Sequence, residues 1–92
     1  MNLYLVTPKV PNVDYEQVTE FVAVSESAEK AVQIHPWEGE PLNMSREEAW
    51  REDNKHRTVM WVRSPQDVYA DLIGTAADHL KEGQILCWGR ND

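Results

Sequence analysis

The sequence predicts a small α+β domain with a mainly antiparallel sheet of four to five strands. One helix, at about 27–35, is expected to pack on a face of the sheet, and a second, charged helix, at about 46–56, is expected on the surface. Segments rich in apolar and β-branched residues indicate the strands, and the short connections between them favour antiparallel pairing. These strand segments are 2–7, 15–25, 58–62, 68–75 and 84–88.

The first two strand segments are separated by a loop with proline, asparagine and aspartate. Residues 2–7 are largely apolar and end at Pro8, which has no N–H group to donate to a sheet. Within 15–25, valines, an alanine and a phenylalanine predict a mostly buried strand, with Glu20 on its solvent side.

The segment 27–35 has the signals of a short helix. Ser25 and Ser27 are suitable N-cap residues, and acidic residues follow at positions where a helix N-terminus favours carboxylates. Small and branched apolar residues recur at helical spacing through Ala31. Pro36 disfavours the helical conformation of His35 and ends the helix.

The segment 46–56 begins with a capping box, in which Ser45 and Glu48 satisfy each other's backbone amides. Most of its side chains are charged, and Ala49 and Trp50 are its apolar exceptions. Such a helix buries little surface, so we expect it to be held to the domain mainly by Trp50.

The C-terminal third is expected to complete the sheet. Residues 64–67 have turn composition, Gly74 suggests a bulge or bend, and 76–82 suggest one helical turn followed by Gly83. Trp61, Cys87 and Trp88 lie in apolar strand segments and are expected in the core. Either 2–7 or 58–62 is expected to be an edge strand able to pair with a second copy.

Length and charge narrow the class of protein. The 92 residues suit a single domain, 1–92, and 16 acidic against 9 basic residues give a net charge of −7. This charge disfavours direct binding to nucleic acid or to anionic membranes. There is no apolar run of membrane-spanning length and no signal-peptide pattern, and the one cysteine forms no internal disulfide, so we expect a cytoplasmic protein.

Several separated motifs together resemble a family of small, uncharacterised proteins of tailed bacteriophages. The pattern runs from Phe21-Val22-Ala23-Val24-Ser25-Glu26-Ser27 through Ile34-His35-Pro36 and Trp61-Val62 to Leu72-Ile73-Gly74-Thr75-Ala76 and Gly83-Gln84-Ile85-Leu86. The charged segment at about 45–56 departs from the pattern as an insertion, and the Cys87-Trp88 end departs as well. The resemblance implies a phage origin and a host-cell cytoplasm, and it brings no functional residue with it.

Residues suited to catalysis or metal binding are few and scattered. His35, His56, His79 and Cys87 are the candidate metal ligands, but none has a metal-site spacing. Cys87 lies in an apolar run that favours a buried, unreactive thiol, and the acidic pairs lie in loop or charged-helix context. The glycines form no phosphate-binding loop. We therefore expect neither catalysis nor a cofactor.

Tryptophan and acidic residues provide the principal hypothesis. Trp37 in a loop and Trp50 on the charged helix are hard to bury, and such tryptophans often anchor protein interfaces. These tryptophans would bind a host factor, a defence component or a second copy, and the chain would act as an inhibitor of its partner. An acidic rim would surround the contact. The rim residues are Glu38, Glu40, Glu47, Glu48, Glu52 and Asp53. A competing interpretation is that Trp37 and Trp50 pack on each other to fasten the inserted helix.

Two other functions fit the same residues. An acidic face that imitates phosphates would make the chain a DNA mimic that inhibits a DNA-binding protein. Alternatively, the chain is a small enzyme or ligand binder whose site lies at a dimer interface and uses His56, His79 or Cys87.

Overall fold

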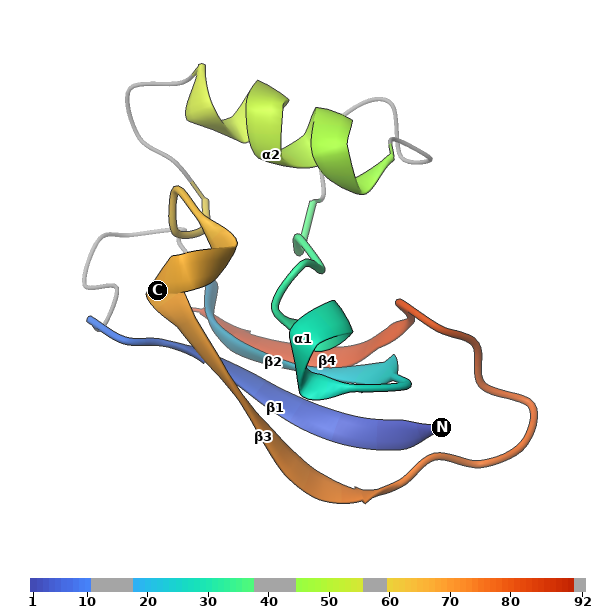
Figure 1. Ribbon diagram of the computed structural model, residues 1–92. Helices are drawn as coiled ribbons and strands as arrows, with labels where there is room; N and C mark the ends of the chain where they lie inside the picture. The colour runs from blue at the N-terminus through green and yellow to red at the C-terminus, as the bar shows by residue number, and fades with distance from the viewer. Residues whose placement is uncertain (11–17, 38–44, 56–59, 91–92) are drawn as a thin grey trace.

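The computed structural model describes residues 1–10, 18–37, 45–55 and 60–90 (Figure 1). It has a four-stranded antiparallel sheet and two helices, one of them short, and so confirms the predicted α+β class. In chain order the elements are β1 (Asn2–Pro8), β2 (Val18–Ser25), α1 (Ala28–Ala31), α2 (Arg46–Asn54), a 3₁₀ turn at Pro65–Asp67, β3 (Val68–Thr75) and β4 (Ile85–Arg90).

The strand order across the sheet is β3-β1-β2-β4, and each neighbouring pair is antiparallel. The segment 2–7 is therefore a central strand, and the expectation that it lies at an edge is wrong. The two edges are β3 and β4. The sheet is irregular near Gly74, where the pairing of β1 with β3 shifts between Leu3 and Tyr4, in agreement with the predicted bulge.

The strand predicted at 58–62 is not formed by its described residues, 60–62. The backbone amides of Met60 and Trp61 donate to the Asp53 carboxylate of α2, over 2.9 and 3.2 Å. One carboxylate thus accepts from two consecutive amides, whereas in a strand these two amides would point to opposite sides. Val18 still donates one backbone hydrogen bond to the Met60 carbonyl. Residues 58 and 59 lie outside the described part of the chain.

The first helix is shorter than predicted. Ser27 is its N-cap, as expected, and its hydroxyl accepts from the Lys30 amide over 3.2 Å. After Ala31 the chain continues in tighter turns and then leaves the helix, which places Ile34, His35 and Pro36 in the interior. Burial of these three residues replaces the last predicted helical turn.

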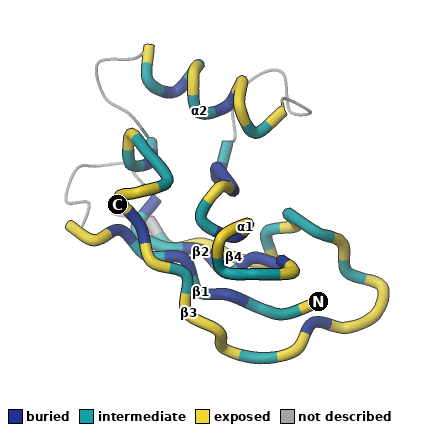
Figure 2. Tube along the Cα trace, viewed as in Figure 1, coloured by how far each residue is buried: buried dark blue, intermediate teal, exposed yellow. Residues whose placement is uncertain are grey.

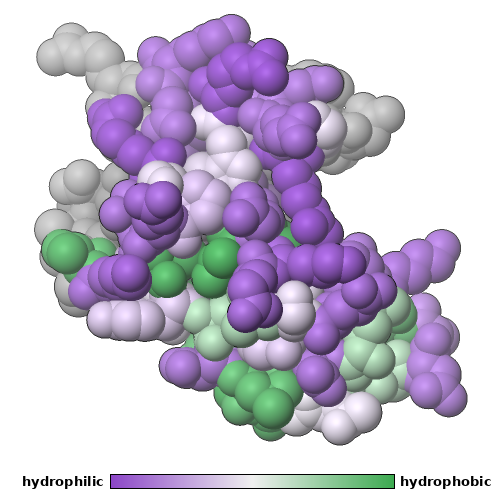
Figure 3. Space-filling view, in the orientation of Figure 1, coloured by the Kyte–Doolittle hydropathy of each residue, from purple (hydrophilic) through white to green (hydrophobic). Residues whose placement is uncertain are grey.

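The second helix follows its prediction closely. The Ser45 hydroxyl caps it by accepting from the Glu48 amide, and Lys55 ends it. His56, the last residue of the predicted helix, lies outside the described residues. The outer surface of α2 is exposed and hydrophilic, while Ala49 and Asp53 face the domain and are buried (Figures 2 and 3).

The hydrophobic core lies between the sheet and the helical side of the molecule. Trp61 is fully buried and packs at 5.1 Å against the ring of Phe21, which confirms its predicted place in the core. Both helices lie on this side of the sheet in Figure 1. The buried members of the core cluster are Tyr4, Val6, Val18, Phe21, Ala23, Ala31, Ile34, Trp61 and Val68.

Cys87 and Trp88, which were expected in the core, are exposed. The reason is topological: β4 is an edge strand that pairs only with β2 in the sheet. Trp88 leaves 44% of its surface in solvent. An apolar sequence run therefore marks an exposed edge here, and the prediction of burial is wrong for both residues.

The connection between β3 and β4 crosses the end of the sheet from one edge to the other (Figure 1). It forms two tight turns, closed by the amides of Leu80 and Gln84, where one helical turn was expected. Gly83 has φ of 87°, a conformation that residues with a Cβ adopt at a cost. Its amide donates to the Val24 carbonyl over 2.8 Å, which ties the connection to β2.

Replacement of Gly83 by alanine tests this turn. Gly83→Ala should lower the free energy of unfolding by about 1–2 kcal/mol, because alanine resists positive φ. Urea denaturation followed by tryptophan fluorescence would measure the change. Gly74→Ala is the matched control, since a Cβ there meets only Leu3 at an ordinary 3.8 Å. Equal losses for the two variants would contradict the assignment of strain to Gly83.

Candidate functional site

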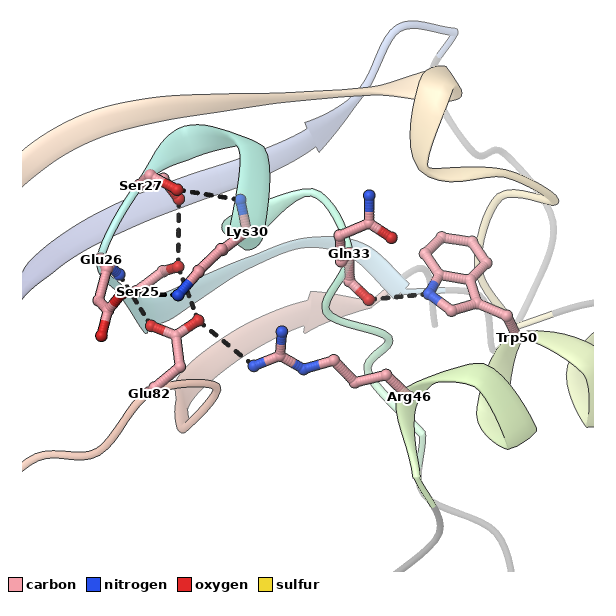
Figure 4. A network of polar contacts seen from close by, with 8 residues as sticks. All are labelled: Ser25, Glu26, Ser27, Lys30, Gln33, Arg46, Trp50 and Glu82. Atoms are coloured by element: carbon pink, nitrogen blue, oxygen red, sulfur yellow. Dashed lines mark hydrogen bonds and ion pairs between the residues drawn. The ribbon is translucent and has the colours of Figure 1, made fainter.

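The two tryptophans expected to anchor a partner are both half-buried. The Trp50 indole N–H donates to the Gln33 carbonyl over 2.8 Å (Figure 4), and its ring packs against the core. The centroid of the His35 ring lies 4.9 Å from that of the Trp50 ring, in an edge-on arrangement, and 6.2 Å from that of the Trp37 ring. Trp50 thus fastens α2 to the segment after α1, and the His35 ring is placed next to both tryptophans.

The acidic residues expected around the tryptophans do not form one continuous rim in the described structure. Glu47 and Glu48 are exposed on α2, and Glu52 is paired with Lys55 at 3.2 Å. Glu38 and Glu40 lie outside the described residues. Asp53 is 3% exposed, so its expected place in an exposed rim is wrong.

Asp53 instead forms a buried polar centre with His35. One of its carboxylate oxygens lies 2.9 Å from His35 Nε2, and both side chains are almost completely buried. Because an ionised carboxylate only accepts hydrogen bonds, Nε2 is the donor. Together with the Met60 and Trp61 amides, this gives the Asp53 carboxylate three donors from two separate segments.

This centre was missed from the sequence, where His35 was considered only at the end of the first helix and among the candidate metal ligands. One signal was present: Asp53 follows Ala49 and Trp50 by four and three residues, so it shares their helix face. A carboxylate on the one apolar face of a charged helix indicates a buried partner. The burial of the Asp53 carboxylate and its three donors from two segments suit a structural role.

A second polar network was also unexpected (Figure 4). The Glu82 carboxylate accepts from the Ser25 hydroxyl over 2.9 Å, from the Glu26 amide over 2.8 Å and from Arg46 over 3.3 Å. It therefore joins the end of β2, the start of α2 and the β3–β4 connection. Beside it, a hydrogen bond from Lys30 lowers the pKa of Glu26, and the same bond raises the pKa of Lys30.

The charges of α2 do not resemble a row of phosphates. Arg46, Arg51 and Lys55 are interleaved with the acidic residues of the same helix. Arg46 and Lys55 are also engaged in ion pairs. This arrangement gives no specific support to the DNA-mimic interpretation.

The face of the sheet opposite the helices carries a second set of apolar side chains. We call it the open face and define it by the strand residues that point away from the core, since directly paired residues share a face. One row crosses all four strands through Asp71, Leu5, Val22 and Cys87. Leu5 and Val22 are half-buried in its middle, and Cys87 is exposed at its edge.

A neighbouring row of the open face begins with Tyr69 and ends with Gly89. Tyr69 pairs with Thr7, and Gly89 pairs with Glu20. Thr7 and Glu20 occupy the next position of the antiparallel β1–β2 pair, since Thr7 follows Val6, Glu20 precedes Phe21, and Val6 pairs with Phe21. Tyr69 is 53% exposed at one edge, and the Lys9 ammonium lies 5.7 Å from its ring centroid. Gly89, at the other edge, has no side chain.

A shallow hollow of about 260 Å³ lies on the β2–β4 side of the open face. Its lining is mainly apolar, with the Glu20 carboxylate close to Gly89. Cys87 is part of it, but the described lining contains no histidine. The lining residues are Leu5, Glu20, Phe21, Val22, Cys87, Trp88 and Gly89.

The remaining candidates for chemistry do not come together in the described structure. His79 is exposed, His35 is bonded to Asp53, and His56 lies outside the described residues. Within the described ranges, no three side chains of histidine, cysteine, aspartate or glutamate are placed to hold a metal ion. None of the described helices has the length and apolar character needed to cross a membrane.

Comparisons with protein-family models, with curated proteins and with solved structures find no match to this chain. The open face is therefore interpreted from its own residues alone.

Removal of the Asp53 carboxylate tests the buried centre. Asp53→Ala should lower the free energy of unfolding by about 3 kcal/mol, because it leaves His35 and two backbone amides without their acceptor. Urea denaturation followed by tryptophan fluorescence would measure the loss. The neighbouring Glu52→Ala should change stability by less than about 0.5 kcal/mol, since it removes only an exposed pair. A loss for Asp53→Ala as small as that for Glu52→Ala would refute the role of the centre.

Proposed function

We propose that this protein acts by binding another protein through the open face of its sheet, without catalysing a reaction. The observation that carries the proposal is the apolar middle of this face, Leu5 and Val22, on the side away from the helices. Single exposed apolar side chains are ordinary, whereas a contiguous apolar patch on a sheet face is typical of an interaction site. The tryptophan anchors expected from the sequence are replaced by this face.

Exposure at both sheet edges supports the proposal. Tyr69 and Ile73 on β3 are each 53% exposed, and Leu86 on β4 is 42% exposed. Large apolar side chains such as Tyr69 suit contact with another folded protein, because they supply most of the affinity in protein interfaces.

The negative charge has a secondary role in this proposal. The exposed carboxylates of α2 lie on the helical side, away from the open face, so they would affect the rate of encounter and the choice of partner more than the contact itself. The mechanism is steric: the bound face covers part of the partner. A host factor, a defence component and the chain itself are the partner classes that the resemblance to phage proteins brings into consideration.

Site-specific photo-cross-linking tests the proposal. A benzophenone amino acid in place of Tyr69 should yield a discrete cross-linked protein when the cells that produce the chain are irradiated. The same group in place of Leu72 is the control, because Leu72 is 63% exposed but pairs with Tyr4 and so points to the helical side. Gel electrophoresis and mass spectrometry would identify the product. Equal cross-linking from the two positions, or none from position 69, would argue against the open face.

A further inference from the structure

We infer that the partner of the open face is a second copy of this chain. The two sheets would pack face to face, about a two-fold axis that lies between them and runs parallel to the strands. This inference rests on the proposed function, since it names the protein that the open face binds. Three features of the described structure support it: the strand order, the exposed Tyr69 side chain at the edge opposite the hollow beside Gly89, and the charge of the open face.

With the axis parallel to the strands, the strand order fixes which strands of the two copies face each other. A two-fold axis between the sheets and parallel to the strands exchanges the two edges of the sheet. In the order β3-β1-β2-β4, it therefore places β3 of one copy over β4 of the other, and β1 over β2. Residues of one cross-strand row stay at the same height, apart from the rotation of about 30° usual between packed sheets.

In the cross-strand row from Tyr69 to Gly89, the open face carries an exposed side chain at one edge and a hollow at the other. Tyr69 on β3 and Gly89 on β4 end the same cross-strand row. The symmetry thus places the exposed Tyr69 ring over the hollow of about 260 Å³ beside Gly89 of the second copy. This hollow is roughly nine times the ~30 Å³ that one water takes in the liquid, so it has room for a side chain. The contact occurs twice in the dimer.

Polar groups at the same place are complementary. A Cβ on Gly89 would lie only 2.5 Å from a Glu20 carboxylate oxygen and 2.6 Å from the Thr19 hydroxyl, so both groups lie against the glycine and the Glu20 carboxylate borders the hollow. A phenol that enters the hollow from the second copy can donate its proton to that carboxylate. Lys9, 5.7 Å from the Tyr69 ring centroid, accompanies the ring and brings a positive charge toward Glu20 of the second copy.

The charge of the open face also permits self-association. The whole chain has a net charge of −7, which opposes the approach of two copies. The two cross-strand rows of the open face, however, contain two described carboxylates, those of Glu20 and Asp71. One described cation, Lys9, lies beside Tyr69. The contact surface is thus close to neutral, and most of the repulsive charge lies outside it.

The size of the sheet sets the expected strength. A width of four strands and a length of seven residues give a planar face of roughly 450 Å² per copy, or about 900 Å² for two, before the relief of the side chains is counted. This is below the roughly 1,200 Å² at which stable specific interfaces begin and in the range of weak, transient contacts. We therefore expect a weak dimer that exchanges readily with the monomer.

Sedimentation equilibrium of the purified chain, from micromolar to near-millimolar concentration, tests the inference. The wild type should show the mass of a dimer that dissociates on dilution. Tyr69→Glu should weaken the dimer by more than about tenfold, because it places a carboxylate against Glu20 of the second copy. Leu72→Glu is the matched control on the same strand, and it should leave the dimer intact because Leu72 points to the helical side.

A charge exchange makes the test specific to this geometry. The double variant Tyr69→Glu/Glu20→Lys should recover dimer formation relative to Tyr69→Glu, since it restores opposite charges across the interface. Circular dichroism checks that each variant is folded, and Tyr69→Ser replaces Tyr69→Glu if that variant is not. A monomeric wild type at every concentration, equal weakening by Leu72→Glu, or no recovery in the double variant would overturn the inference.

The outcomes separate this inference from the proposed function. If the wild type is monomeric and position 69 cross-links a different protein, the second copy is excluded and the open face remains a binding surface. If the wild type is monomeric and position 69 yields no discrete product, both proposals fail. A dimer that Tyr69→Glu dissociates, with a cross-link at position 69 to the same chain, supports both.

Discussion

The architecture depends on one buried carboxylate. Asp53 accepts hydrogen bonds from His35 and from the backbone amides of Met60 and Trp61, and so ties α2 to the segment after α1 and to the segment before β3. Burial of this charge would be costly without these three donors. By holding residues 60 and 61 in this way, it keeps them out of the sheet and places Trp61 against Phe21 in the core. In the described chain the sheet therefore has four strands, with β3 and β4 as its edges.

A one-sided core follows from this arrangement. Both helices and the buried cluster lie on the same face of the sheet, together with the Asp53 centre and the Glu82 network. The opposite face keeps Leu5 and Val22 half-buried and Cys87 exposed. An antiparallel sheet with one solvated face normally alternates apolar and polar residues along each strand, whereas β1 carries apolar side chains on both faces. The second apolar face is the physical basis of the proposed binding function.

Much of the local structure was predictable because it depends on short-range signals. The serine caps at Ser27 and Ser45, the irregularity near Gly74 and the positive φ of Gly83 all follow from the chemistry of a few neighbouring residues. The errors came from long-range order. Strand order decided that 2–7 is central and that Cys87 and Trp88 lie on an edge, and sequence runs of apolar residues do not encode that order. Asp53 was assigned to an exposed rim because its partners are distant in the chain, although its position beside Ala49 and Trp50 on α2 indicated a buried face.

The central claim, that one apolar face of the sheet is open in the single chain and is covered by a partner, is tested most directly by the thiol of Cys87. Its rate of reaction with an aromatic disulfide reagent should be measured in the native protein as a function of protein concentration. At high dilution the rate should approach that of the urea-unfolded chain, because Cys87 is exposed on the open face. It should fall as concentration rises and a second copy covers the face. A native rate that is far below the unfolded rate even at the highest dilution would contradict the account, since it would place Cys87 in the interior of the single chain.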